Sequence, residues 1–141
     1  MFTNFLHNLN RLLSSPDIMS MFLGGAGYTL LLSFITVFFG AILGSLLALA
    51  RRSAFKPLSL LVTAYVELVR GTPLLLQLYL FYFVIPGLLP WLNLSKFASV
   101  SLALVLNSAA YVCEIVRAGI QAVDFGQTEA ARTLGLSARQ A

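Results

Sequence analysis

Two short stretches of the chain carry the same spacing of an acid and a base. Glu67 precedes Arg70 by three residues, and Glu114 precedes Arg117 by three. Residues three apart share one face of a helix, so each glutamate can pair with its own arginine or with a neighbouring helix. The flanking residues are apolar, and ionised groups there are costly unless they are paired or face a wet interior. The two pairs therefore either lock helices together or line the path of a polar solute.

Four uncharged polar residues in the same stretches carry the same two interpretations, solute path or polar contact between helices. They are Thr72, Gln77, Asn107 and Ser108. No pattern typical of an enzyme accompanies them, because the chain lacks Cys/His metal spacing, a phosphate loop and a histidine beside an acid. We expect no catalytic residue, no metal site and no cofactor, and we expect His7 to be a solvated residue at the membrane interface.

Composition places the chain in a membrane. Of its 141 residues, 59% are hydrophobic and 10% are charged, whereas soluble domains carry roughly 25% charged residues. The net charge of +4 is small and unevenly distributed, which favours a role in membrane topology over nucleic-acid binding. We expect an all-α integral membrane protein surrounded by lipid.

Three apolar stretches are long enough to cross a bilayer, each needing about 20 residues. We predict membrane helices over 23–49, 60–86 and 97–119, after an external segment over 1–22 whose amphipathic surface helix ends at Pro16. The second stretch is longer than one span requires, so we predict a kink near Pro73.

Small residues recur every four positions along the first predicted span, at Gly40, Gly44 and Ala48. This spacing opens a groove that lets a second helix approach closely. We expect a helix–helix contact there.

Basic residues predict the orientation. The loop over 51–57 and the tail would share one side, which then holds Arg51, Arg52, Lys56, Arg117, Arg132 and Arg139, against Arg11 and Lys96 on the other. Positive residues favour the cytoplasmic side. We therefore expect the N-terminus outside and the tail in the cytoplasm.

The tail over 124–135 is short and polar. Residues 127–134 favour a helix, Gly135 suits its C-terminal stop, and residues 137–140 have the spacing of a capping box that opens another helix. A helix of about eight residues is marginal in water alone. Ala130, Ala131 and Leu134 offer it a small apolar face, so we expect it to dock on a partner.

Three motifs resemble one family. Glu129-Ala130-Ala131-x-x-x-Gly135 resembles the EAA coupling motif of permease subunits of bacterial ATP-binding-cassette importers. The run over 67–77, ELVRGTPLLLQ, and the pattern AYxxEIxRxGIxxVxxGQ over 110–127 resemble the polar amino-acid branch of that family, of the histidine, glutamine and glutamate type.

The resemblance implies a type I importer permease fold, here partial: three transmembrane helices and a cytoplasmic coupling helix in a bacterial cytoplasmic membrane. It implies an EAA helix that fits a cleft on a cytoplasmic ATP-binding subunit, which alone binds and hydrolyses ATP. The contact set would be Gly126, Glu129, Ala130, Ala131, Leu134 and Gly135. An external binding protein would deliver a polar amino acid, and a second permease subunit, identical or homologous, would complete the pathway.

Members of that branch continue with two further spans beyond the EAA loop, so we expect residues 1–141 to form a single incomplete permease domain. Two alternatives stay open. One is a permease for another small solute, such as an opine or a sulfur-containing amino acid. The other is a membrane assembly subunit that does not transport.

Overall fold

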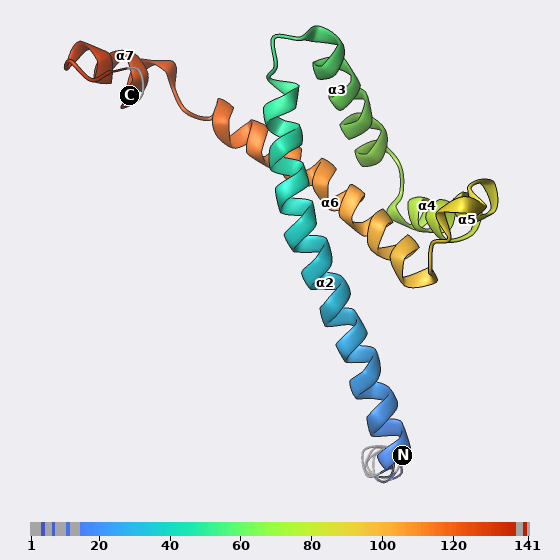
Figure 1. Cartoon of the computed structure of the whole chain (residues 1–141). Helices are drawn as coiled ribbons and strands as arrows, with labels where there is room; N and C mark the ends of the chain where they lie inside the picture. Colours follow the sequence, from blue (N-terminus) through green and yellow to red (C-terminus); the bar gives the residue numbers. More distant parts are fainter. Residues whose placement is uncertain (1–3, 5–6, 8–10, 12–14, 138–139, 141) are drawn as a thin grey trace.

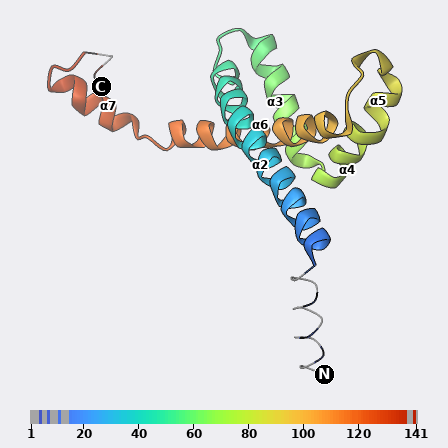
Figure 2. The ribbon, with the colours of Figure 1, turned by 60° about the horizontal axis from the view of Figure 1, so that its bottom comes forward.

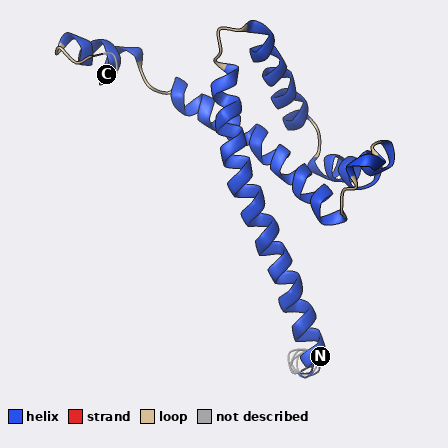
Figure 3. Ribbon diagram, in the orientation of Figure 1, coloured by secondary structure: helices blue, strands red, loops and turns tan. Residues whose placement is uncertain are grey.

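The computed structural model describes residues 4, 7, 11, 15–137 and 140, and this part of the chain contains helices and loops without a strand (Figure 3). The elements are α2 (Pro16–Arg51), α3 (Lys56–Gly71), α4 (Leu74–Tyr79), a π-helical segment (Leu80–Val84), α5 (Ile85–Leu88), a 3-10 turn (Pro90–Leu92), α6 (Lys96–Gln121) and α7 (Phe125–Thr133). The surface helix expected within 1–15 lies mostly outside the described residues, although His7 is exposed.

Two helices, α2 and α6, are long and apolar enough to cross a membrane, and α3 with α4–α5 makes a third span if that bent pair is counted as one. Large apolar side chains remain exposed along these helices, among them Phe34, Leu46 and Ile115. Such a surface suits hydrocarbon rather than water.

Helix α2 is longer than the span predicted over 23–49. Its 36 residues correspond to about 54 Å, more than the roughly 30 Å of a hydrocarbon core. Pro16 is its first residue, after an extended Ser15. Proline suits the first position of a helix because its missing N–H has no intrahelical partner there. Pro16 therefore begins this helix.

Helices α2 and α6 cross each other and make the most extensive contact in the structure (Figures 1 and 2). The buried residues of α2 are Gly40, Gly44 and Ala48. A Cβ atom added at Gly40 would lie 2.5 Å from the Ser108 hydroxyl oxygen, and one at Gly44 would lie 2.6 Å from the Val112 Cβ. The small residues therefore allow the two backbones to approach, as the four-residue spacing predicts.

The second apolar stretch is broken rather than kinked. Helix α3 ends at Gly71, α4 begins at Leu74, and the two parts differ in direction by 104°. Pro73 cannot donate a backbone hydrogen bond and disfavours helical geometry at the residue before it, and Thr72 is extended. The stretch predicted over 60–86 with a kink near Pro73 is therefore broken by 104° at that place.

Polar side chains satisfy the backbone at this break. Gln77 Nε2 donates to the Val69 carbonyl at 2.7 Å and to Thr72 Oγ1 at 2.8 Å, and Thr72 Oγ1 donates to the Leu68 carbonyl at 2.9 Å. Asn107 Nδ2 on α6 donates to Gln77 Oε1 at 3.0 Å. The Gln77 amide thus caps the end of α3, and the Asn107 amide links the break to α6.

Helix α3 packs on α2 and α6 through a small apolar core of Ala48, Val62, Val66, Val69, Ala110 and Cys113. At its edge the Tyr65 hydroxyl donates to the Leu106 carbonyl at 2.7 Å. Within the described chain, α7 makes no packing contact with another helix, and Figure 1 shows it beyond the end of α6.

Replacing Gly44 by alanine should lower the stability of the helix bundle by about 1–3 kcal/mol, because the new methyl group overlaps α6. Gly27→Ala is the matched control, since a Cβ there meets no atom within 4 Å. Thermal unfolding in detergent, followed by circular dichroism, measures both variants. Equal unfolding midpoints for the two would contradict the close α2–α6 contact.

Replacing Gln77 by leucine should destabilise the protein by about 1–3 kcal/mol, because it leaves the Val69 carbonyl and the Asn107 amide unpaired. In a double-mutant cycle with Asn107→Leu, the double variant should lose less stability than the sum of the losses in the two single variants. Strict additivity in chemical unfolding would show that the two amides do not interact.

Candidate functional site

Three arginines surround one carboxylate. Arg51 Nη1 lies 2.7 Å from Glu114 Oε2, Arg70 Nη1 lies 3.6 Å from the same oxygen, and Arg117 pairs with Oε1. These are the ion pairs that the described part of the chain contains. Because the arginines come from α2, α3 and α6, a single acidic side chain links all three helices.

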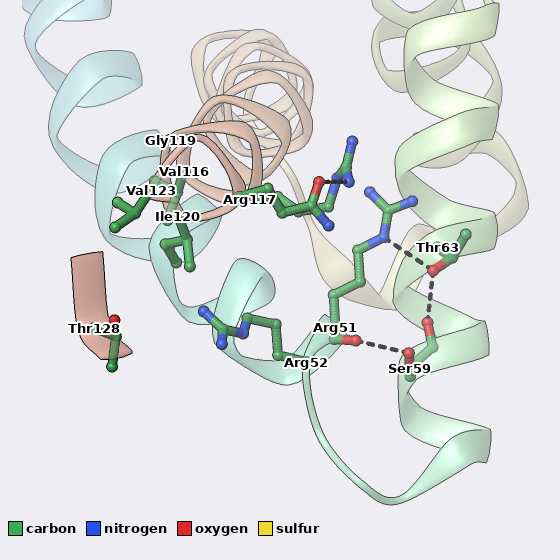
Figure 4. Close-up of a pocket in the computed structure, with 11 residues that line it drawn as sticks. Arg51, Arg52, Ser59, Thr63, Val116, Arg117, Gly119, Ile120, Val123 and Thr128 are labelled. Carbon is green, nitrogen blue, oxygen red and sulfur yellow. Dashed lines mark hydrogen bonds between the residues drawn. The ribbon is translucent and has the colours of Figure 1, made fainter. Parts of the chain in front are cut away.

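Arg51 and Arg70 are each held by a further interaction besides the ion pair. Arg51 is the last residue of α2, and its Nε donates to Thr63 Oγ1 at 3.0 Å, while Ser59 Oγ donates to its carbonyl at 2.7 Å (Figure 4). Arg70 lies 5.6 Å from the centroid of the Tyr111 ring, within the range of a cation–π contact. The cluster is therefore fixed from several sides.

The charges in this cluster do not cancel. Three guanidinium groups face one carboxylate, so two positive charges remain. The Glu114 side chain is only 20% exposed, which strengthens its attraction to the arginines. Removing that carboxylate would leave three like charges close together, an arrangement that costs free energy.

Of the two arrangements considered for Glu67 and Arg70, pairing within α3 is absent, and Arg70 crosses to another helix. Glu67 is exposed, it belongs to no ion pair within residues 15–137, and Arg70 turns to Glu114 instead. Val66 and Val69 face the core, and Glu67 follows Val66 by one residue, or about 100° around the helix. The pairing of Glu114 with Arg117 is present as predicted.

The other polar candidates serve helix contacts in this structure. Thr72, Gln77 and Asn107 form their hydrogen bonds at the break between α3 and α4. Ser108 lies against Gly40 at the α2–α6 contact. Of the two roles considered for these residues, the contacts support the polar link between helices.

Sequence reasoning missed the role of Arg51, which it used only as a marker of orientation. Arg51 is the first charged residue after the apolar run from Ile18 to Ala50. Because Gly40, Gly44 and Ala48 pack on α6, Arg51 at the end of α2 lies close to the charged residues of α6. The position of Arg51 after the apolar run was therefore visible in the sequence. Predicting its partner would also have required knowing which residues of α2 lie against which residues of α6.

A pocket of about 1150 Å³ opens beside the carboxylate cluster (Figure 4). We call it the basic pocket. Its lining residues are Arg51, Arg52, Ser59, Thr63, Val116, Arg117, Gly119, Ile120, Gln121, Val123 and Thr128. No group of three potential metal ligands occurs among the described residues.

Helix α7 is closed at both ends by its own sequence. Asp124 accepts a hydrogen bond from the Gly126 N–H at 2.8 Å. At the other end the Leu136 N–H donates to the Ala131 carbonyl, the Gly135 N–H donates to the Arg132 carbonyl, and Gly135 adopts a φ of 87°. This is a Schellman motif, with glycine at the position that requires a left-handed backbone.

The EAA face of α7 is open. Glu129 and Ala130 are exposed, Ala131 is half-buried, and Leu134 is 84% exposed. Since no other described helix packs on α7, this face is available to a partner. Beyond α7, Gln140 Oε1 accepts hydrogen bonds from the Ser137 N–H and hydroxyl, which matches half of the predicted capping box.

Permease subunits from bacteria are similar to this chain over most of its length. The probable glutamine ABC transporter permease protein GlnM of Bacillus subtilis (strain 168) is 43% identical over 125 residues, covering 89% of this chain and 57% of the relative. The arginine transport system permease protein ArtQ of the same organism is 43% identical, covering 92% and 58%. The L-cystine transport system permease protein TcyB is 41% identical, covering 81% and 48%. The chain thus spans about half the length of these relatives.

One solved structure, described as a crystal structure of an amino acid ABC transporter with histidines, shares this fold. It superposes with a TM-score of 0.78 at 44% identity, covering 89% of this chain and 58% of that one. Residues 40–141 match the family described as "Binding-protein-dependent transport system inner membrane component". The chain belongs to this family of inner membrane transport components.

Proposed function

We propose that this chain forms part of the membrane permease of an ATP-driven importer for polar amino acids. The open EAA face of α7 carries the proposal, because a capped helix on which no other described helix packs is suited to dock on another protein. The partner would be a cytoplasmic ATP-binding subunit, which hydrolyses ATP. An external binding protein would supply the amino acid, and a second permease subunit would complete the path.

The relatives support an amino acid as the solute. Their names give glutamine, arginine and L-cystine, all polar but different in charge. L-cystine matches the sulfur-containing alternative that the sequence left open. Competition for uptake by each of the three amino acids separates these solutes.

The carboxylate cluster would transmit movement of α7 into the membrane. α7 follows α6 after a loop of three residues, and α6 carries Glu114, which holds α2 and α3 through their arginines. A push on α7 would therefore move together the parts of α2, α3 and α6 that carry the cluster. In this proposal, the tail and the Arg51 end of α2 face the cytoplasm.

Replacing Gly135 by valine should uncouple ATP hydrolysis from uptake in the complete importer, because a β-branched residue resists the φ of 87° at a cost of about 1–2 kcal/mol. Gly135→Asn is the matched control, since asparagine tolerates this conformation. Within the part of the chain that the structure describes, no atom lies within 4 Å of the added Cβ, so the two variants differ there in backbone strain rather than in contacts.

The readouts are ATPase rate and uptake of radiolabelled glutamine in proteoliposomes. Valine should reduce the uptake per ATP hydrolysed, and asparagine should retain it. Glu129→Lys, which reverses the charge of the open face, should also reduce it. Normal coupling in both the valine and the lysine variants would refute the docking role of α7.

Replacing Glu114 by glutamine should destabilise the permease by about 1–3 kcal/mol, because charge-assisted hydrogen bonds to two arginines are lost. Glu67→Gln is the matched control and should stay within about 0.5 kcal/mol, because that side chain is exposed. Adding Arg51→Gln to the Glu114 variant should recover part of the loss. Equal effects of the two single changes on thermal unfolding would contradict the cluster.

A further inference from the structure

The arginines that line the basic pocket carry more positive charge than nearby acidic residues neutralise. Arg51, Arg52 and Arg117 line it, and the described lining includes no acidic residue. Arg51 and Arg117 share the carboxylate of Glu114. Arg52 makes no ion pair or side-chain hydrogen bond with the part of the chain that the structure describes. Its charge remains available to an anion.

The same pocket has an apolar wall. Val116, Ile120 and Val123 lie along one side of it, on α6 and just beyond its end. Figure 4 shows these side chains grouped at the left of the view, with Arg117 and Arg51 to their right and Arg52 below. Cationic and hydrocarbon surfaces side by side suit a ligand that has an anionic head and an apolar body.

The pocket lies where α2 and α6 end. Arg51 closes α2, and Gln121 closes α6. In the orientation given under the proposed function, on which this step depends, these ends reach the cytoplasmic surface of the membrane. Anionic phospholipids attract basic residues at that surface, and basic pockets between membrane helices on this side bind their headgroups.

We propose that the basic pocket binds the phosphate of an anionic phospholipid from the cytoplasmic leaflet. Arg52 supplies the free positive charge, and Arg51 and Arg117 extend the positive field. The upper part of an acyl chain lies against Val116 and Ile120. The pocket exceeds the roughly 300–1,000 Å³ typical of small-molecule sites, so its volume of about 1150 Å³ accommodates a headgroup with part of its chains.

The test measures lipid retention by the complete permease. Purified protein in a neutral detergent is titrated with phosphatidylglycerol or with phosphatidylcholine, and native mass spectrometry counts the bound lipids. Arg52→Gln should weaken phosphatidylglycerol binding about fivefold, the effect expected for one arginine near a charged surface. Arg52→Lys should keep most of the binding.

Arg132→Gln is the matched control. Arg132 lies on α7 one turn after Thr128, which lines the pocket, but Arg132 itself does not line it. Its loss removes the same charge and should leave phosphatidylglycerol retention unchanged. Equal losses in the two glutamine variants would overturn the proposal, because they would indicate a diffuse electrostatic effect. Displacement of the lipid by millimolar inorganic phosphate would also overturn it, by showing a site for free anions.

This experiment separates the lipid site from the importer function. Retention in detergent requires neither ATP nor a binding protein, whereas coupling is measured by uptake. Normal coupling without selective phosphatidylglycerol binding would contradict the lipid site alone. Selective binding in a permease whose Gly135 and Glu129 variants stay coupled would contradict the function alone.

Discussion

The close approach of α2 and α6 is the constraint on which the rest of the structure depends. Gly40 and Gly44 leave no room for a side chain at this contact, so the two helices have one register. Arg51 follows Gly44 by seven residues, about two helical turns, and therefore arrives beside Glu114. A larger residue at either glycine would move that arginine as well as the contact.

The arginine–carboxylate cluster extends this constraint to α3. One partly buried carboxylate holds cations from three helices, and the apolar core beneath it is small, consisting mainly of valine and alanine. The charged groups thus link α2, α3 and α6 around Glu114. At the C-terminal end of α3, next to Arg70, the amides of Gln77 and Asn107 form a further link to α6 without charge.

The sequence predicted the features that depend on local pattern. The small-residue spacing, the break near Pro73 and the glycine stop of α7 each follow from the conformational limits of one or two residue types. Pairing across the fold could not be predicted. Glu67 and Glu114 have the same spacing to an arginine, yet only Glu114 faces the other helices, because the direction of each side chain depends on how its helix is rotated in the bundle. Arg51 joins the cluster for the same reason.

Helix α7 relates this arrangement to function. Its ends are capped by Asp124 and Gly135, and its EAA face is open, which suits a short helix that docks on a partner. In the proposed function, α7 receives movement from an ATP-binding subunit. The carboxylate cluster would carry that movement to the membrane helices.

A photo-crosslinking amino acid at position 134 tests this account most directly, because Leu134 is 84% exposed on the open face. In the assembled importer, irradiation should join position 134 to the ATP-binding subunit, while the same probe at Leu68, which is 67% exposed on α3, should not reach that subunit. Crosslinks from position 134 to lipid or to a permease subunit alone would contradict the docking of α7.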